Sequence, residues 1–139
     1  LHVHETREEV DTAVREHGTR PLARLDALGV VGPRLVAVHS VHLEAGEIDL
    51  LAAKGASVAH CPSSNLKLAS GIAPVARLID AGVTVGIGTD GSASNNRLDL
   101  HEEMRLAAVL QAVRHQPGAL TARDAVWMAT REGARALPT

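Results

Sequence analysis

The stretch Val83-Thr-Val-Gly-Ile-Gly-Thr-Asp-Gly-Ser-Ala-Ser-Asn-Asn96 predicts a buried strand that ends at a functional site. Three β-branched residues open it directly after Gly82, a residue that commonly ends a helix. Beyond the strand, Asp90 enters a loop of small polar residues, where a ligand or a metal ion can approach the backbone. We therefore expect the other strands of the chain to lie beside this one and to contribute to the same site.

The segment Gly86-Ile-Gly-Thr-Asp-Gly91 also fits the glycine pattern of dinucleotide-binding folds. A true fingerprint opens a helix at its last glycine and is followed, about 20 residues on, by an acidic residue at the end of a second strand. Here small polar residues follow Gly91, and two long helical patterns then run to the end of the chain without another strand. The sequence therefore argues against a dinucleotide site.

Three further strands are expected over residues 1–4, 35–39 and 56–60, and each ends on a histidine. Helical patterns cover residues 7–17, 21–28, 47–54, 74–81, 98–115 and 121–136, and residues 63–71 are expected to form a polar loop. Four strand-helix units in succession, with continuous apolar strands, predict an α/β fold with a parallel sheet and helices outside it. Four units are half of an eight-stranded barrel, so residues 1–139 are interpreted as one partial domain of a longer chain.

Composition excludes several functional classes. The net charge is -2 and no two Lys or Arg residues are adjacent, and a nucleic-acid partner is therefore not expected. Cys61 is the only cysteine, which excludes an internal disulfide and suits a reducing compartment. No apolar run approaches the roughly 20 residues of a membrane span. We expect a cytoplasmic protein without a membrane partner, and the sequence is compatible with a homo-oligomer.

Polar side chains follow the end of each predicted strand. His2 or His4 with Glu5, then His39, then His60, and then Asp90 stand at these ends, which all face the same way in a parallel arrangement. Imidazole and carboxylate groups are the ligands of a divalent metal ion that activates water. His2 and Asp90 fit this role, although a catalytic zinc site takes three or more protein ligands, so the others must lie outside this sequence.

Two of these residues suit catalysis without being ligands. Glu5 lies three residues beyond His2, an offset that lets a general acid or base reach a substrate beside the metal ion. His39 is placed to hold or polarise a metal-activated water. The structural alternatives are a hydrogen-bonded histidine at a strand end, an acidic residue at a helix N-terminus for Glu5, and a loop cap for Asp90.

Four segments together carry a resemblance to a known family. They are His2-Val-His-Glu-Thr6, Val38-His39, His60-Cys-Pro-Ser-Ser-Asn-Leu-Lys-Leu-Ala-Ser-Gly71 and Gly88-Thr-Asp-Gly-Ser-Ala-Ser-Asn-Asn96. The chain resembles the amidohydrolase superfamily over essentially its whole length. Within it, the chain is similar to the branch of 5-methylthioadenosine and S-adenosylhomocysteine deaminases and triazine hydrolases. The resemblance implies a metal-dependent (β/α)8 barrel, of which residues 1–139 would be strands five to eight with their helices.

The resemblance also assigns roles to single residues. It implies that His2 and Asp90 bind one divalent metal ion, zinc in the first place, and that Glu5, His39 and Asp90 are catalytic. Glu5 and Asp90 would also contact the substrate, and His4 would not be a ligand. The family's His-x-His metal pair and its earlier substrate-binding loops are not in these 139 residues. Activity is therefore expected of the intact protein.

The implied reaction is hydrolytic deamination of a purine nucleoside such as 5-methylthioadenosine or S-adenosylhomocysteine. Asp90 would deprotonate the metal-activated water, His39 would orient it, and Glu5 would protonate the neighbouring ring nitrogen. The same chemistry on 8-oxoguanine, guanine or a pterin, or on a triazine, is the nearest alternative. An inactive half barrel that acts as an interaction module is the alternative from another class.

Overall fold

The computed structural model describes residues 1–137 and contains four strands and eight helices within them. In chain order these elements are β1 (His2–Val3), α1 (Arg7–His17), α2 (Pro21–Ala27), β2 (Val36–His39), α3 (Ala45–Lys54), β3 (Ser57–His60), α4 (Pro62–Lys67), α5 (Val75–Asp80), β4 (Thr84–Ile87), α6 (Leu100–Arg114), α7 (Ala122–Ala129) and α8 (Arg131–Ala136).

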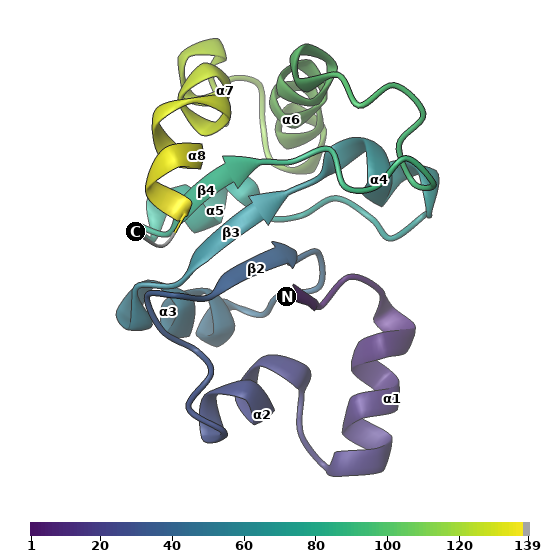
Figure 1. Cartoon of the computed structure of the whole chain (residues 1–139), viewed down its shortest axis with the longest axis vertical. Coiled ribbons are helices and arrows are strands. Elements are labelled where there is room, and N and C mark those ends of the chain that lie inside the picture. Colours follow the sequence, from purple (N-terminus) through teal and green to yellow (C-terminus); the bar gives the residue numbers. More distant parts are fainter. Residues whose placement is uncertain (138–139) are drawn as a thin grey trace.

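The four strands form one parallel sheet in the order β1-β2-β3-β4 (Figure 1). His2 pairs with Val38, and Ser57 pairs with Thr84, so the carboxyl ends of all four strands lie along one rim. Each connection between neighbouring strands contains at least one helix, as parallel pairing requires. The predicted α/β fold with a parallel sheet, arranged as the carboxyl-terminal half of a (β/α)8 barrel, is confirmed.

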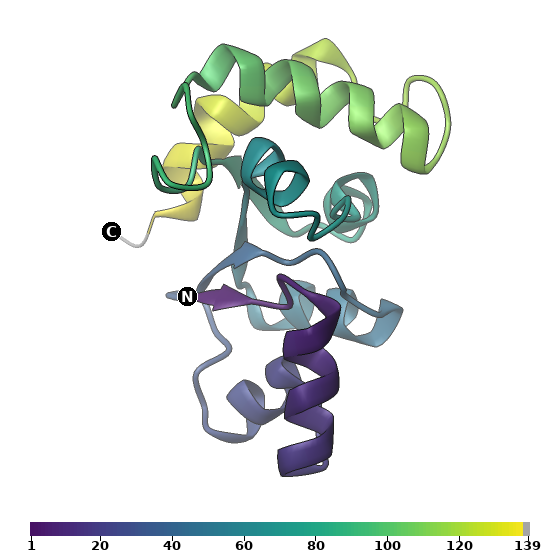
Figure 2. The ribbon, with the colours of Figure 1, turned by 90° about the vertical axis from the view of Figure 1, so that its right-hand side faces the viewer.

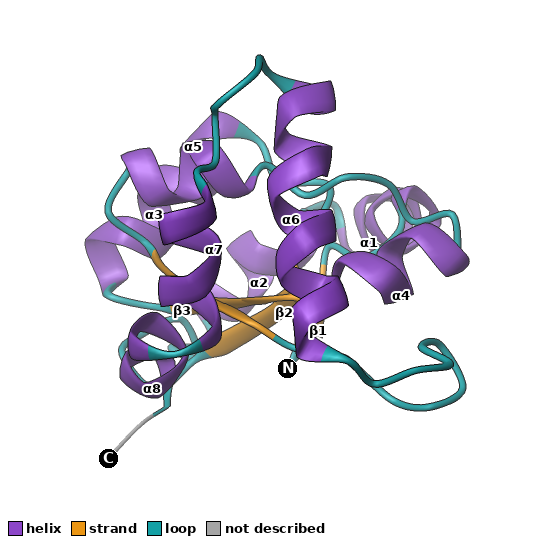
Figure 3. Cartoon of the chain, turned by 90° about the horizontal axis from the view of Figure 1, so that it is seen from above, coloured by secondary structure: helices purple, strands orange, loops and turns teal. Residues whose placement is uncertain are grey.

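Five of the eight described helices lie at the two ends of the molecule, and α3, α4 and α5 lie between them (Figure 1). In Figure 1, α1 and α2 lie at one end of the molecule, and α6, α7 and α8 lie at the other. Turning the molecule shows α6 as a long helix along one side (Figure 2), and α6 and α7 lie next to each other in the view from above (Figure 3). Among residues 1–137, no helix has the length and apolar character needed to cross a membrane.

Apolar side chains between the strands and the helices form one core. Val58 of β3 and Val85 of β4 are buried against helical residues such as Leu51, Leu78 and Met128. Burying a side chain of this size contributes roughly 1.5–3 kcal/mol relative to leaving it exposed. The same core therefore holds the strand ends in register and positions the groups at the rim.

Two expectations about secondary structure were wrong. Residues 63–71 were expected to be a polar loop, but α4 begins at Pro62, which pre-sets the first helical turn, and it buries Ser64 and Asn65. The single helix expected over residues 121–136 is divided at Thr130, where φ is -129° and ψ is -91°. The division lets α8 pack on β4, where a Cβ added to Gly86 would lie 3.1 Å from the Cα of Gly133.

Candidate metal centre

Three of the four strand ends have unusual backbone geometry at the rim. His4, His39 and Asp90 have φ values of 55°, 71° and 60°, in the left-handed region that side chains other than glycine rarely adopt. Such conformations cost on the order of 1–3 kcal/mol each and tend to cluster at functional sites. The backbone thus changes direction at the positions where the sequence places its imidazole and carboxylate groups.

His2, Glu5 and His39 converge at the carboxyl ends of β1 and β2. Their ligand atoms all lie within 4.8 Å of one another. The Nδ1 atom of His2 is 3.0 Å from the Nε2 atom of His39, and the Oε2 atom of Glu5 lies 3.9 Å and 3.5 Å from these two nitrogens. The His39 side chain is buried, whereas 58% of the His2 side chain is exposed. The cluster therefore has a closed side and a side open to solvent.

The hydrogen bonds of His39 suit this cluster for a metal ion. Its Nδ1 lies 2.8 Å from the Oδ1 of Asn65, an oxygen that can only accept, so Nδ1 donates to Asn65 and Nε2 is the ring nitrogen that faces His2. Two nitrogens bound tetrahedrally to zinc at about 2.05 Å would lie about 3.3 Å apart, close to the 3.0 Å between His2 and His39. The residues present therefore fit a divalent ion: His2 would be its ligand here, with His39 and Glu5 close enough to act on a water or substrate beside it.

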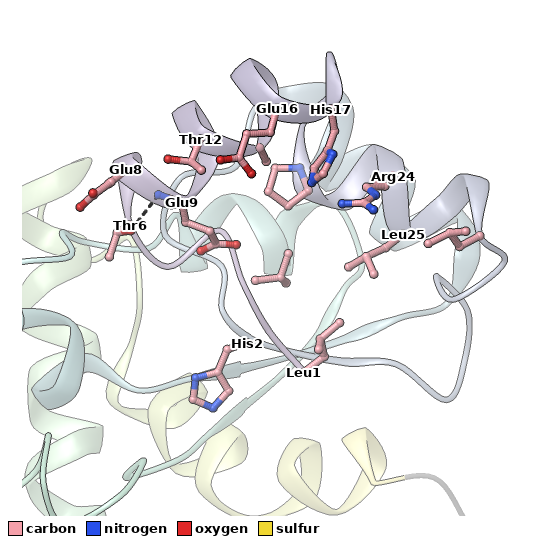
Figure 4. A pocket seen from close by; sticks show the side chains of 14 residues that line it. Leu1, His2, Thr6, Glu8, Glu9, Thr12, Glu16, His17, Arg24 and Leu25 are labelled. Carbon is pink, nitrogen blue, oxygen red and sulfur yellow. Dashed lines mark hydrogen bonds between the residues drawn. The ribbon is translucent and has the colours of Figure 1, made fainter.

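The backbone around Glu5 is held by a second carboxylate. The Oε1 and Oε2 atoms of Glu9 accept hydrogen bonds from the backbone N–H groups of His4 and Glu5, at 2.9 Å and 2.8 Å. Glu9 is fixed in turn because its own N–H donates to the hydroxyl of Thr6, the N-cap of α1 (Figure 4). These contacts hold the turn that carries Glu5 beside His2.

Asp90 follows β4 in the same sheet but is held by a different kind of contact. Its Oδ2 accepts hydrogen bonds from the hydroxyls of Ser94 and Ser64, at 2.6 Å and 2.7 Å. The hydrogen bond from Ser94, followed by that from Ser64, lowers the pKa of Asp90 to about 2, with a smaller contribution from the charge of His39. Asp90 is therefore ionised at neutral pH, as a metal ligand must be.

The other two histidines at strand ends lie outside this cluster. His4 is fully buried, where its Nε2 accepts from the N–H of Leu22 at 3.1 Å and lies 3.2 Å from a Glu47 oxygen that also binds Arg20. Burial lowers the pKa of His4 and favours its neutral form. His60 is also fully buried, and burial lowers its pKa to about 3.

The structure thus brings together some of the predicted site residues and not others. His2, Glu5 and His39 form the cluster, whereas Asp90 is not one of its members. The shared binding of one ion by His2 and Asp90 stays a prediction. Sequence reasoning missed the side chains that hold these groups: Glu9, Ser64, Asn65 and Ser94. Of these four, only Ser64 and Asn65 had a signal in the sequence, because they lie in α4 and Pro62 is typical of a first helical turn.

An apolar cavity of about 600 Å³ lies beside the cluster, between β1, α1 and α2. His2 borders it together with Leu1, Leu25 and the threonines of α1 and its N-cap, whereas Glu5 and His39 do not (Figure 4). The cavity therefore adjoins the cluster of His2, Glu5 and His39 at His2 and is otherwise separate from it.

Residues 1–139 match the model of the amidohydrolase family. A 5'-deoxyadenosine deaminase of Methanothermobacter thermautotrophicus is 54% identical over 138 residues, which are 99% of this chain and 32% of that protein. A 5-methylthioadenosine/S-adenosylhomocysteine deaminase of Haloarcula marismortui is also 54% identical, with the same coverage. The chain thus spans about a third of the length of these curated relatives.

Solved structures agree with this similarity. An adenosine deaminase of Xanthomonas campestris with bound zinc superimposes with a TM-score of 0.96 and 53% identity, over 99% of this chain and 31% of that one. A triazine hydrolase of Arthrobacter aurescens superimposes with a TM-score of 0.91 and 34% identity, over 98% of this chain and 30% of that one. With the parallel half barrel and the histidine-carboxylate cluster at its rim, these similarities establish that the chain belongs to the amidohydrolase family.

Proposed function

We propose that the intact protein is a zinc-dependent hydrolytic deaminase of adenosine-type nucleosides, with 5-methylthioadenosine or S-adenosylhomocysteine as substrate. The observation that carries this proposal is the cluster of His2, Glu5 and His39, in which the hydrogen bond to Asn65 turns Nε2 of His39 toward the other two side chains. The names of the relatives at about half identity support the adenosine-type substrate.

In this proposal His2 and Asp90 hold the ion together with ligands from the rest of the protein. When bound, the ion activates the attacking water and stabilises the negative charge that develops in the transition state. His39 orients the water, and ionised Asp90 accepts its proton. The carbon-oxygen bond forms at the ring carbon that bears the amino group.

Glu5 acts on the substrate side of the reaction. Its side chain is 21% exposed, so it can reach a bound purine, while Glu9 keeps its backbone in place. Glu5 protonates the ring nitrogen next to the attacked carbon, and the proton held by Asp90 passes to the leaving amine. The carbon-nitrogen bond then breaks with its electron pair leaving on ammonia, and the proton of the new hydroxyl returns to Glu5 as the 6-oxo purine forms.

A substrate panel on the intact protein tests this proposal, with ammonia release as the measurement. The panel contains 5-methylthioadenosine, S-adenosylhomocysteine, 5'-deoxyadenosine, guanine, 8-oxoguanine, a pterin and an aminated triazine. Turnover of the adenosine compounds at the highest kcat/KM is expected. Activity confined to the guanine-like compounds or the triazine would contradict the substrate, and no activity on any of them would favour a non-catalytic module.

A further inference from the structure

Glu103 is a buried carboxylate that the proposed reaction does not use. It lies in the first turn of α6, is 1% exposed, and forms no ion pair with any residue between 1 and 137. Its Oε1 accepts from the Nδ2 of Asn95 at 2.7 Å, and its Oε2 accepts from the backbone N–H of Ser63 at 3.0 Å. A buried charge is costly unless its hydrogen bonds are made, so these two contacts account for its retention in the fold.

The contact with Asn95 organises the loop after β4. The Nδ2 of Asn95 also donates to the carbonyl of Thr89, the residue before Asp90, at 2.9 Å. The Oδ1 of the same side chain accepts from the N–H groups of Arg97 and Leu98, both at 3.2 Å. Asn95 itself is 4% exposed. Through it, Glu103 holds both sides of the loop that carries Asp90.

The contact with Ser63 reaches Asp90 from the opposite side. Ser63 lies in the first turn of α4, and the next residue, Ser64, donates its hydroxyl to the Oδ2 of Asp90 at 2.7 Å. By accepting from the Ser63 N–H, Glu103 ties the start of α4 to the start of α6. One carboxylate therefore joins the two segments that meet at Asp90.

We propose that Glu103 is a positioning residue for Asp90, acting through Asn95 on the backbone beside it and through the Ser63–Ser64 turn on its carboxylate. This inference rests on the proposed function only for the role given to Asp90 as a metal ligand. Glu103 touches neither that ion nor the substrate in this assignment.

Glu102 provides a matched control on the same helix. It is adjacent to Glu103, but it is partly exposed and its carboxylate pairs with Arg105 one turn further along α6. Both residues are acidic groups in the first turn of α6, so the sequence pattern does not distinguish them. Glu102→Gln therefore makes the same chemical change as Glu103→Gln without touching the segments around Asp90.

The experiment compares these two variants in the intact, zinc-loaded protein. In Glu103→Gln one of the two donors faces an amide N–H₂ in place of an oxygen, so the Asp90 loop loosens. We expect zinc release to a chelator to be about 10–100-fold faster than in the wild type, as is common when a group that holds a ligand is removed. We also expect a lower kcat with a smaller change in KM, and faster amide exchange over residues 89–98. Glu102→Gln should match the wild type in all three measurements.

A second variant keeps the test decisive if Glu103→Gln does not fold. Asn95→Ala removes the link to Glu103 together with the hydrogen bonds to Thr89, Arg97 and Leu98, so faster zinc release is expected here too, and the double variant should show less than the combined effect of the single ones. Zinc retention and amide exchange equal to the wild type, even with a lower Tm, would assign Glu103 a purely structural role and overturn the proposal.

The measurements also separate this proposal from the proposed function. Absence of ammonia release in the wild type would refute the deaminase activity, whereas the zinc-release comparison would still decide the role of Glu103. If the wild type binds no zinc, amide exchange over residues 89–98 in the Glu103→Gln and Glu102→Gln variants decides the role of Glu103 instead.

Discussion

The two sides of the rim at the carboxyl ends of the strands are built differently. At the ends of β1 and β2, His2, Glu5 and His39 lie in direct contact, within 4.8 Å of one another. At the end of β4, Asp90 accepts hydrogen bonds from two serine hydroxyls and is not part of that cluster. The first side is thus an assembled group of donors, and the second is one carboxylate held by neutral partners.

This difference assigns different tasks to the two sides. The close contacts at the ends of β1 and β2 place an exposed imidazole, a buried imidazole and a carboxylate at one point. At Asp90, the hydroxyl donors stabilise the charged form and are the main cause of its low pKa of about 2. We therefore expect substitutions at Asp90 to affect binding of the ion, and substitutions at Glu5 to affect proton transfer.

The largest effect is expected for Asp90→Asn in the intact protein. The amide cannot supply the negative charge, so zinc content and turnover should both be lost, with kcat reduced on the order of 10⁴-fold, the upper end for an acid-base group. Metal analysis and ammonia release measure the two losses. Asp99→Asn, at the exposed N-cap of α6, is the control. Full activity in Asp90→Asn would refute its assignment.

Glu5→Gln should separate catalysis from metal binding. Without the acid, we expect kcat to fall about 10²-fold or more, within the usual range for general acid-base catalysis, while zinc content stays that of the wild type. Steady-state kinetics and metal analysis of the same sample decide the result, with the exposed Glu8→Gln as the control. If zinc were lost together with activity, Glu5 would be a ligand of the ion.

A smaller effect is expected for Asn65→Leu. This change removes the acceptor that keeps the proton on Nδ1 of His39, so the ring is free to turn or to change tautomer. Zinc affinity or kcat should weaken by about 10–100-fold, as measured by chelator competition and ammonia release. Asn65→Asp keeps an acceptor oxygen and should retain more of both. Equal losses in the two variants would show that the hydrogen bond does not orient His39.

The smallest effect is expected away from the rim, at the N-cap of α7. Thr121 and Asp124 form a reciprocal capping box, and Thr121→Ala should lower the free energy of unfolding by about 1 kcal/mol without changing zinc content. Hydrogen bonds from Thr121 lower the pKa of Asp124, so the stabilisation is present above the ordinary carboxyl pKa and fades as the pH falls through the lowered value.

Thermal unfolding of the wild type, Thr121→Ala and the control Thr121→Ser at several pH values measures this effect. The gap between the first two should be widest near neutral pH and should narrow on acidification. A change in zinc content in Thr121→Ala would show that the N-cap of α7 affects the metal site at the rim, and would contradict this prediction.

Much of the fold was predictable because its signals are local. Gly18 and Gly55 end α1 and α3 in the left-handed conformation, as glycines commonly do at helix ends. The apolar runs before His39 and His60 predicted β2 and β3 to within one residue. The division between α7 and α8 was missed because packing on β4 depends on distant parts of the chain, whereas the start of α4 was missed although Pro62 is a local signal for it.

For the site, the sequence by itself determined which groups stand at the strand ends, since the order of apolar runs and polar residues places His2, His39 and Asp90 there. Only the tertiary structure decided how those groups are held, through Asn65, Ser64, Ser94 and Glu103. The physical reason is the separation along the sequence between the residues that interact. Strand ends follow from the periodicity of neighbouring residues, whereas a hydrogen bond such as that from Ser63 to Glu103 joins residues 40 positions apart and exists only once the helices have packed.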